Sequence, residues 1–253
     1  MKTKFNSIER FAIFLAIALA ITGCKTSHHS CCSMASCGMD GAAAVSAVQT
    51  KDSQAAMTPA QALAELKAGN ARFVAGKSLH RDFPAQVVAT AGGQYPFAVV
   101  LSCLDSRQPI EIVLDQGVGD IFSARVAGNI LDDDILGSME FACKVSGAKL
   151  IAVIGHSNCG AIKGAIDDVE LGNLTGLLTK IKPAIASVPA DGQPRTTKNY
   201  GFVDAVSEAN VKLVMQQIRE RSPILREMLD KQEIALVGGM YDLKTGQVQF
   251  YEP

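Results

Sequence analysis

The sequence predicts an α/β protein with a mostly parallel central sheet flanked by helices. Short apolar runs rich in branched residues are bounded by Pro or Gly and alternate with stretches of helical spacing, which is typical of buried parallel strands between helices. Two of these runs, 97–101 and 150–155, lead directly into the polar motifs Cys103–Arg107 and His156–Cys159. Because ligands collect at the carboxyl ends of parallel strands, a functional site is expected there.

The composition is that of one soluble domain. The chain has 253 residues, of which 48% are hydrophobic and 19% are charged, and this length suffices for one well-buried core. The formal net charge of -1 offers no basic surface, so nucleic acid is excluded as a partner.

Residues 1–23 have the pattern of a secretory signal peptide. Basic residues precede the apolar run 11–21, which is too short for a comfortable membrane span. The sequence Ile21-Thr22-Gly23-Cys24 resembles the cleavage box of bacterial lipoproteins, and that resemblance implies a lipid on Cys24. Lys25, where some lipoproteins have Asp, favours the outer membrane. We expect an exported protein on the periplasmic side, held to the membrane only by its lipid; an ordinary cleaved signal without lipid is the alternative.

Residues 24–56 are expected to form a flexible tether, because they are rich in Ser, Ala, Gly and Cys and have little periodicity. Their thiols could form disulfides in an oxidising compartment, and their Cys and His side chains could bind a soft metal adventitiously. We assign no site to this segment, since no expected helix or strand fixes its geometry. The folded domain is expected over residues 57–253.

The domain is expected to begin with a helix. Thr58 is its N-cap, Pro59 occupies the first helical position, and Gly76 marks its end. Residues 77–95 are expected to form a connection to the first strand.

Helices and strands are then expected to alternate. The elements around the two motifs are a short helix at 109–114, a strand at 120–125, a helix at 132–145, a strand at 150–155 and a helix at 159–166. Asp132, Asp133 and Asp134 fall in the first turn of their helix, where its dipole stabilises negative charge. A cation site is the alternative use of these three carboxylates.

The C-terminal part is expected to contain three more helices and two strands. Residues 173–187 and 202–220 have amphipathic spacing, and Ser222-Pro223 begins a helix that extends to Asp230. Strands at 234–241 and 247–251 are joined by a turn, so the sheet should have an edge at the C-terminus.

Cys103, His156 and Cys159 are candidate ligands of one metal ion. Two thiols and one imidazole suit Zn²⁺, and a Cys2His set leaves the fourth position for water or a carboxylate. A buried His or Cys is more often part of a core, but these three stand at strand ends with a short H-x-x-C spacing. Cys143 and His80 stand alone and are interpreted as structural.

Asp105 and Arg107 are candidates for a hydrogen-bonded pair beside the metal. Residues two apart in an extended segment point the same way, so the carboxylate and the guanidinium can meet. A plain ion pair that holds the turn is the alternative, but the position of Asp105 two residues from a ligand favours a functional pair.

These motifs resemble those of the β-class carbonic anhydrases. The resemblance rests on C-x-D-S-R followed by H-x-x-C, and it covers roughly residues 58–250. Supporting pieces agree in order and spacing: Asn70-Ala71-Arg72-Phe73, Asp115-Gln116-Gly117, Arg125-Val126-Ala127-Gly128-Asn129 and the run from Gly155 to Gly160. The resemblance implies the β-carbonic anhydrase fold, one zinc per chain, and a homo-dimer or tetramer.

The resemblance also implies an activity and roles for residues. Zinc-bound hydroxide would convert carbon dioxide to bicarbonate and a proton, reversibly. Asp105, held by Arg107, would accept a hydrogen bond from that hydroxide, or in a closed form would itself bind zinc. The substrate-contacting residues would be Gln94, Phe122, Ala127 and Phe141. Ala127 and Phe141 depart from the Val and Tyr of plant members. Ordinary core packing is a second interpretation of the two Phe, and both interpretations can hold at once.

Other functions fit the same residues. Relatives with this site hydrolyse carbon disulfide or carbonyl sulfide, and an assay with those substrates separates the activities. A zinc-stabilised surface protein without turnover is a further alternative, although it would not need Asp105 and Arg107. A cysteine protease is excluded, because His156 and Cys159 lie together at a helix start without a pattern of oxyanion donors.

Overall fold

The computed structural model describes residues 47–251. The predicted signal peptide, Cys24 and residues 24–46 of the predicted tether therefore lie outside the described residues. Among residues 47–251, no helix combines the length and the apolar character that a membrane span requires.

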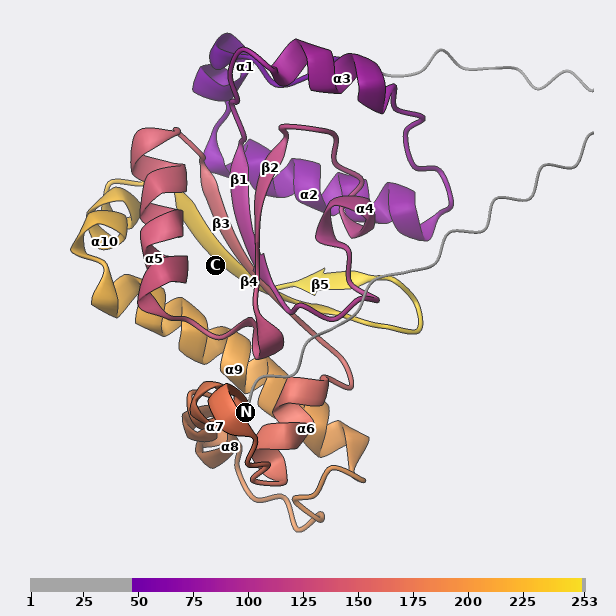
Figure 1. The fold of residues 1–253 in the computed structure, drawn as a ribbon, viewed down its shortest axis with the longest axis vertical. Coiled ribbons are helices and arrows are strands. Elements are labelled where there is room, and N and C mark those ends of the chain that lie inside the picture. Colours follow the sequence, from indigo (N-terminus) through magenta and orange to yellow (C-terminus); the bar gives the residue numbers. More distant parts are fainter. Residues whose placement is uncertain (1–46, 252–253) are drawn as a thin grey trace, which may run out of the picture. The chain divides into compact units, whose positions relative to one another are not determined.

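The centre of the fold is a five-stranded sheet with the order β2-β1-β3-β4-β5 (Figure 1). Its parallel strands are β1 (Ala98–Ser102), β2 (Ile121–Arg125), β3 (Leu150–His156) and β4 (Ala235–Tyr241), and β5 (Val248–Phe250) is antiparallel to β4. The predicted α/β class, with a mostly parallel sheet and an antiparallel edge at the C-terminus, is confirmed.

Helices cover both faces of this sheet (Figure 1). The covering helices are α2 (Pro59–Val74), α4 (Ile110–Val113), α5 (Asp133–Glu140), α9 (Tyr200–Arg221) and α10 (Pro223–Asp230). Val100 belongs to the core beneath α2 and α4, whereas its neighbours Val99 and Leu101 belong to the core beneath α5, α9 and α10. Successive side chains of β1 thus point to opposite faces, and burying each contributes about 1.5–3 kcal/mol.

Several helix boundaries agree with the capping residues in the sequence. Thr58 caps α2 by accepting a hydrogen bond from the Gln61 N–H, and Gly76 just beyond the helix has φ of 64°, a conformation that favours glycine. Asp132 caps α5 in the same manner, accepting from the Ile135 N–H. The capping interpretation of Asp132 is thereby confirmed.

The tether was expected to extend to residue 56, but α1 (Lys51–Ala56) is already part of the folded domain. Its N-cap is Thr50. The buried amide of Gln54 donates hydrogen bonds of 2.7 Å to the carbonyls of Pro96 and Ser146, and these bonds attach α1 to the domain.

Two other segments differ from their expected structure. The connection 77–95 contains α3 (Phe83–Thr90), which Asp82 caps. The single helix expected at 173–187 is divided into α7 (Gly172–Thr179) and α8 (Lys182–Ser187). Pro183 explains the division, because it has no N–H and is tolerated only in a first helical turn.

The last turn of the helix expected at 132–145 also differs. It widens into the π-helical segment η2 (Phe141–Val145). Cys143 in this segment is 2% exposed and belongs to the core, which agrees with its structural interpretation. His80 is exposed.

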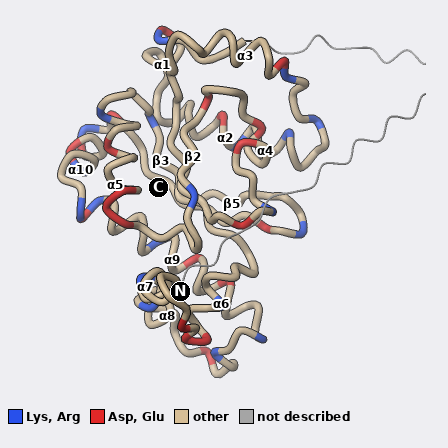
Figure 2. The backbone as a smooth tube through the Cα atoms, viewed as in Figure 1, with Lys and Arg blue, Asp and Glu red and all other residues tan. Residues whose placement is uncertain are grey.

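Charged side chains of both signs are interspersed over the helices and loops (Figure 2). Within the five strands, Arg125 is the one Lys, Arg, Asp or Glu. It stands at the carboxyl end of β2, in register with Ser102 at the end of β1.

Candidate metal centre

Cys103, His156 and Cys159 meet at the carboxyl edge of the sheet. Cys103 directly follows β1, His156 ends β3, and Cys159 is the N-cap of α6 (Gly160–Ile166). The strands β1 and β3 are parallel neighbours, so their ends lie side by side. The three side chains are buried, and their ligand atoms lie within 4.8 Å of one another.

The spacing and the hydrogen bonding of these side chains fit zinc. The two Sγ atoms are 3.9 Å apart, whereas two sulfurs bonded to one tetrahedral zinc at about 2.3 Å lie roughly 3.8 Å apart. Nε2 of His156 is buried without a hydrogen-bond partner among the described residues, an arrangement that is costly unless the atom binds a ligand. Nδ1 of His156 lies 2.9 Å from the Ser157 carbonyl, and donation of its N–H there leaves the Nε2 lone pair free for a metal.

The two thiols are electrostatically coupled. The pKa of Cys103 is lowered to about 4, chiefly by the hydrogen bond with Cys159 and also by His156 and the Gly128 N–H, against the opposing effect of burial. The same hydrogen bond between the two thiols raises the pKa of Cys159, as does burial, because a second negative sulfur beside the first is unfavourable. A divalent cation between the sulfurs would remove this repulsion and favour two thiolates.

Asp105 and Arg107 form the expected pair beside these ligands. Asp105 Oδ1 accepts from the backbone N–H and the Nε of Arg107, both at 2.9 Å, and Oδ2 accepts from the guanidinium at 2.7 Å. Arg107 is the main reason why the pKa of Asp105 is lowered to about 2. Asp105 Oδ2 also lies 3.8 Å from His156 Nε2, so an ionised carboxylate lies close to the metal position.

Arg125 fixes the backbone that carries Cys103 and Asp105. Its Nε donates to the carbonyl of Cys103 at 3.1 Å, and its terminal nitrogen donates to the carbonyl of Asp105 at 2.7 Å. In the sequence, Arg125 is marked only by the motif Arg125–Asn129. Its charge at the end of an otherwise uncharged strand is the signal that could have identified this role.

Two predicted substrate-contacting residues, Ala127 and Gln94, lie at opposite ends of the parallel strands. Ala127 is half-buried and precedes Gly128, whose N–H donates to Cys103 Sγ at 3.3 Å. Gln94 is exposed and precedes β1, so it lies toward the amino ends of the strands. Within one chain, the structure therefore places Ala127 at the metal centre and Gln94 away from it.

The other two predicted substrate-contacting residues, Phe122 and Phe141, contact each other along β2. Their ring centroids are 6.2 Å apart in an edge-to-face arrangement, and both line a pocket of about 690 Å³. Phe122 pairs in register with Val99, four residues before Cys103, which is roughly 13 Å along a strand. Phe122 packs against the core, in agreement with the structural alternative, whereas Phe141 is 49% exposed.

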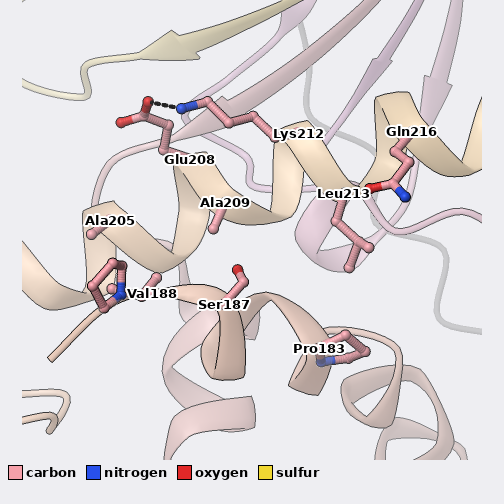
Figure 3. Close-up of a pocket in the computed structure, with 10 residues that line it drawn as sticks. Pro183, Ser187, Val188, Ala205, Glu208, Ala209, Lys212, Leu213 and Gln216 are labelled. Atoms are coloured by element: carbon pink, nitrogen blue, oxygen red, sulfur yellow. Dashed lines mark hydrogen bonds and ion pairs between the residues drawn. The ribbon is translucent and has the colours of Figure 1, made fainter.

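A separate hollow lies between α8 and α9 (Figure 3). It has a volume of about 460 Å³ and is lined by Pro183, Ser187, Leu213 and the ion pair Glu208–Lys212, among others. None of the candidate metal ligands lines it. Within residues 47–251, Cys103, His156 and Cys159 are the one group of three or more such side chains placed to hold a metal.

The fold and the site together define a class of protein. A structural zinc site is normally closed by four protein ligands, whereas a catalytic site keeps one position open. Three ligands beside an ionised carboxylate, at the carboxyl edge of a parallel sheet, define an α/β zinc enzyme.

Comparison with known proteins identifies the family. The carbonic anhydrase family profile matches residues 98–248. Carbonic anhydrase 2 of Mycobacterium tuberculosis is 36% identical over 198 residues, which are 75% of this chain and 91% of that protein. The carbonic anhydrase of Mycolicibacterium smegmatis is 37% identical over 200 residues, which are 76% of this chain and 92% of the relative. The chain belongs to the carbonic anhydrase family.

A solved structure extends this comparison to the fold. A tetrameric β-carbonic anhydrase from the ascomycete Sordaria macrospora superimposes with a TM-score of 0.58 at 25% identity, covering 76% of this chain and 96% of that chain. The fold is that of the β-carbonic anhydrases.

A carbon disulfide hydrolase from Acidithiobacillus thiooxidans matches a smaller part of the sequence. It is 34% identical over 77 residues, 28% of this chain and 36% of that protein.

Proposed function

We propose that this protein is a zinc-dependent carbonic anhydrase that interconverts carbon dioxide with bicarbonate and a proton. The convergence of Cys103, His156 and Cys159 beside the paired Asp105 and Arg107 is the observation that carries this conclusion. The family membership supports it independently.

The ligand set determines what zinc would contribute. When held by Cys103 Sγ, His156 Nε2 and Cys159 Sγ, zinc would act as a Lewis acid that lowers the pKa of a coordinated water to about 7. Ser157 keeps the imidazole in the required tautomer through the contact with Nδ1. Arg125 keeps Cys103 in place by binding its carbonyl.

Asp105 is placed to orient the attacking water. Oδ1 accepts two hydrogen bonds from Arg107, whereas Oδ2 accepts one and lies nearer the metal position. We assign to Oδ2 the role of accepting the hydrogen of that water, so that an oxygen lone pair faces carbon dioxide. Arg107 fixes the carboxylate in this orientation, which lowers the entropic cost of reaching a reactive geometry.

The test is hydration of carbon dioxide, measured from pH 6 to 9, with zinc determined in the same sample. We expect about one zinc per chain and activity that rises with pH, because a zinc held by these ligands would lower the pKa of a water and so supply a nucleophile in its deprotonated form. Full zinc without hydration at any pH would contradict the proposal. Carbon disulfide would then be the next substrate to assay, since the partial match to a carbon disulfide hydrolase favours it.

We also propose that the chain forms a homo-oligomer in which Gln94, Phe122 and Phe141 serve the site of a neighbouring copy. This proposal explains why the three residues lie away from the metal centre of their own chain. It is supported by the position of β2 as the outermost strand of the sheet that residues 47–251 form, by the exposed apolar side chains of Val87 and Val88 on α3, and by the tetrameric state of the Sordaria macrospora relative. Light scattering should give a dimer or tetramer, and a monomer at micromolar concentration would contradict it.

The sequence of residues 1–24 supports a further proposal about localisation. We propose that the protein is exported and attached to the periplasmic face of the outer membrane through lipid on Cys24. Mass spectrometry of the mature N-terminus should find a diacylated or triacylated Cys24, and a soluble product with an unmodified N-terminus would rule out the lipid anchor.

A further inference from the structure

The turn after β2 donates a backbone hydrogen bond directly to a candidate metal ligand. This turn comprises Val126 and η1 (Ala127–Asn129) and closes with a hydrogen bond of 2.9 Å from the Asn129 N–H to the Val126 carbonyl. The Gly128 N–H lies 3.3 Å from Cys103 Sγ in a buried environment. A donor aimed at a ligating sulfur stabilises its negative charge and orients it, so the conformation of this turn bears on the metal.

The conformation of the turn is strained. The strain is at Asn129, whose φ of 41° lies in the left-handed region that is costly for a residue with a side chain and persists where the surroundings hold it. Gly128, with φ of 67°, adopts this region without such a cost. Gly128 cannot be replaced freely, because an added Cβ would meet Ile181 Cδ1 at 2.8 Å and Ala161 Cβ at 3.2 Å.

Asn210 on α9 donates a hydrogen bond to the turn at the carbonyl of Gly128. Its Nδ2 donates to the Gly128 carbonyl at 2.8 Å, and the bond is buried. That carbonyl belongs to the peptide linking Gly128 to Asn129, the two left-handed residues. Gly128 therefore contacts Cys103 through its N–H and Asn210 through its carbonyl.

The position of Asn210 in α9 also indicates a specific role. It is 1% exposed and lies on the buried face with Val206, Val211 and Val214. Its Oδ1 has no hydrogen-bond partner among the described residues, so the amide is held in this apolar setting by the bond from Nδ2 to Gly128. The same helix also binds the segment between the candidate ligands His156 and Cys159, because Asp204 Oδ1 accepts a hydrogen bond from the Asn158 N–H at 2.8 Å.

We infer that Asn210 is a positioning residue of the metal centre, which holds the strained turn so that the Gly128 N–H points at Cys103 Sγ. The inference rests on the proposed function in that it takes zinc as the resident metal. It adds to that function a residue outside both sequence motifs, acting from 82 residues further along the chain.

The test replaces Asn210 with Leu, which has a similar volume and no hydrogen-bonding group. We measure zinc affinity by competition with a chelator, and the sulfur-to-metal charge-transfer absorption of the Co²⁺-substituted protein. We expect zinc affinity to fall about 10–100-fold, as for other residues that orient metal ligands, together with a shifted charge-transfer band. Unchanged affinity and an unchanged spectrum in a folded N210L protein would overturn the inference.

A matched control separates this role from packing. Ser207 is also polar and buried on α9, but its hydroxyl donates to Val203 within the helix. Ser207→Ala should therefore leave zinc affinity and the cobalt spectrum unchanged, and an equal effect of both variants would overturn the inference. Circular dichroism reports whether N210L folds; if it does not, Asn210→Ser is measured by the same criteria.

A second variant tests the strain itself. Asn129→Gly removes the cost of a left-handed side-chain-bearing residue, so it should restore part of the zinc affinity that N210L loses. Absence of any restoration in the double variant would contradict a role through the turn. A wild-type protein that binds no zinc would instead overturn the proposed function, so the two failures are distinguishable.

Discussion

Cys159→Ser is expected to remove zinc from the protein and to reduce carbon dioxide hydration to the rate of the uncatalysed reaction. Cys159 is 1% exposed and its Sγ is 3.9 Å from that of Cys103. A Ser hydroxyl is a much poorer zinc ligand than a thiolate, and Cys103 and His156 alone do not form the three-ligand set that a catalytic zinc needs. Zinc per chain and the hydration rate are measured on the same sample.

Cys143→Ala is the matched control for loss of a buried thiol. Cys143 is 2% exposed, and burial raises its pKa to about 12, so its thiol stays neutral and unreactive. This variant should lose some stability through the small cavity but keep its zinc and activity. A Cys159→Ser protein that retained one zinc and wild-type activity would show that the metal is held elsewhere.

Asp105→Asn should slow hydration about 10²–10⁴-fold, the usual contribution of a positioned proton-accepting group, while zinc content stays the same. Asn has nearly the same shape as Asp, but it is neutral and loses the charge-assisted bonds to Arg107. The variant therefore removes the orienting acceptor at Oδ2 without removing any of the three ligands. Steady-state hydration rates at saturating zinc provide the measurement.

Asp132→Asn provides the same chemical change away from the site. Asp132 accepts the Ile135 N–H as the N-cap of α5, and Asn caps helices about as well as Asp. Its activity should match that of the wild-type protein. If Asp105→Asn also stayed within tenfold of wild type, Asp105 would have only the structural role of a plain ion pair.

The metal ligands could be predicted from the sequence because their positions depend on local pattern. The β-branched runs before Cys103 and His156 identify strands, and neighbouring parallel strands place the residues that follow them on one edge. The same reasoning located the helix caps Thr58 and Ser222, whose side chains accept from backbone groups three residues away. Such contacts are determined by the nearest residues in the chain.

The structure differs from the predicted helices where the local sequence signal is a single residue or where distant residues decide the outcome. The division of 173–187 follows from Pro183, a signal that was present in the sequence. The helix α1 has a local N-cap in Thr50, but its attachment to the domain has no local signal, because Gln54 binds carbonyls at positions 96 and 146. The resemblance that named Gln94 carries no information on which edge of the sheet, or which copy of the chain, that residue serves.

The sequence by itself determined the α/β class and the order of the strands along the chain, because these follow from period and spacing, and it predicted the candidate ligand set of Cys103, His156 and Cys159 from strand ends together with the family motif. Only the tertiary structure showed that Arg125 holds the carbonyls on either side of Leu104 and that Asn210 holds the turn at Gly128. Hydrogen bonds between such distant segments depend on the path of the whole chain, and that path leaves no periodic pattern in the residues that form them.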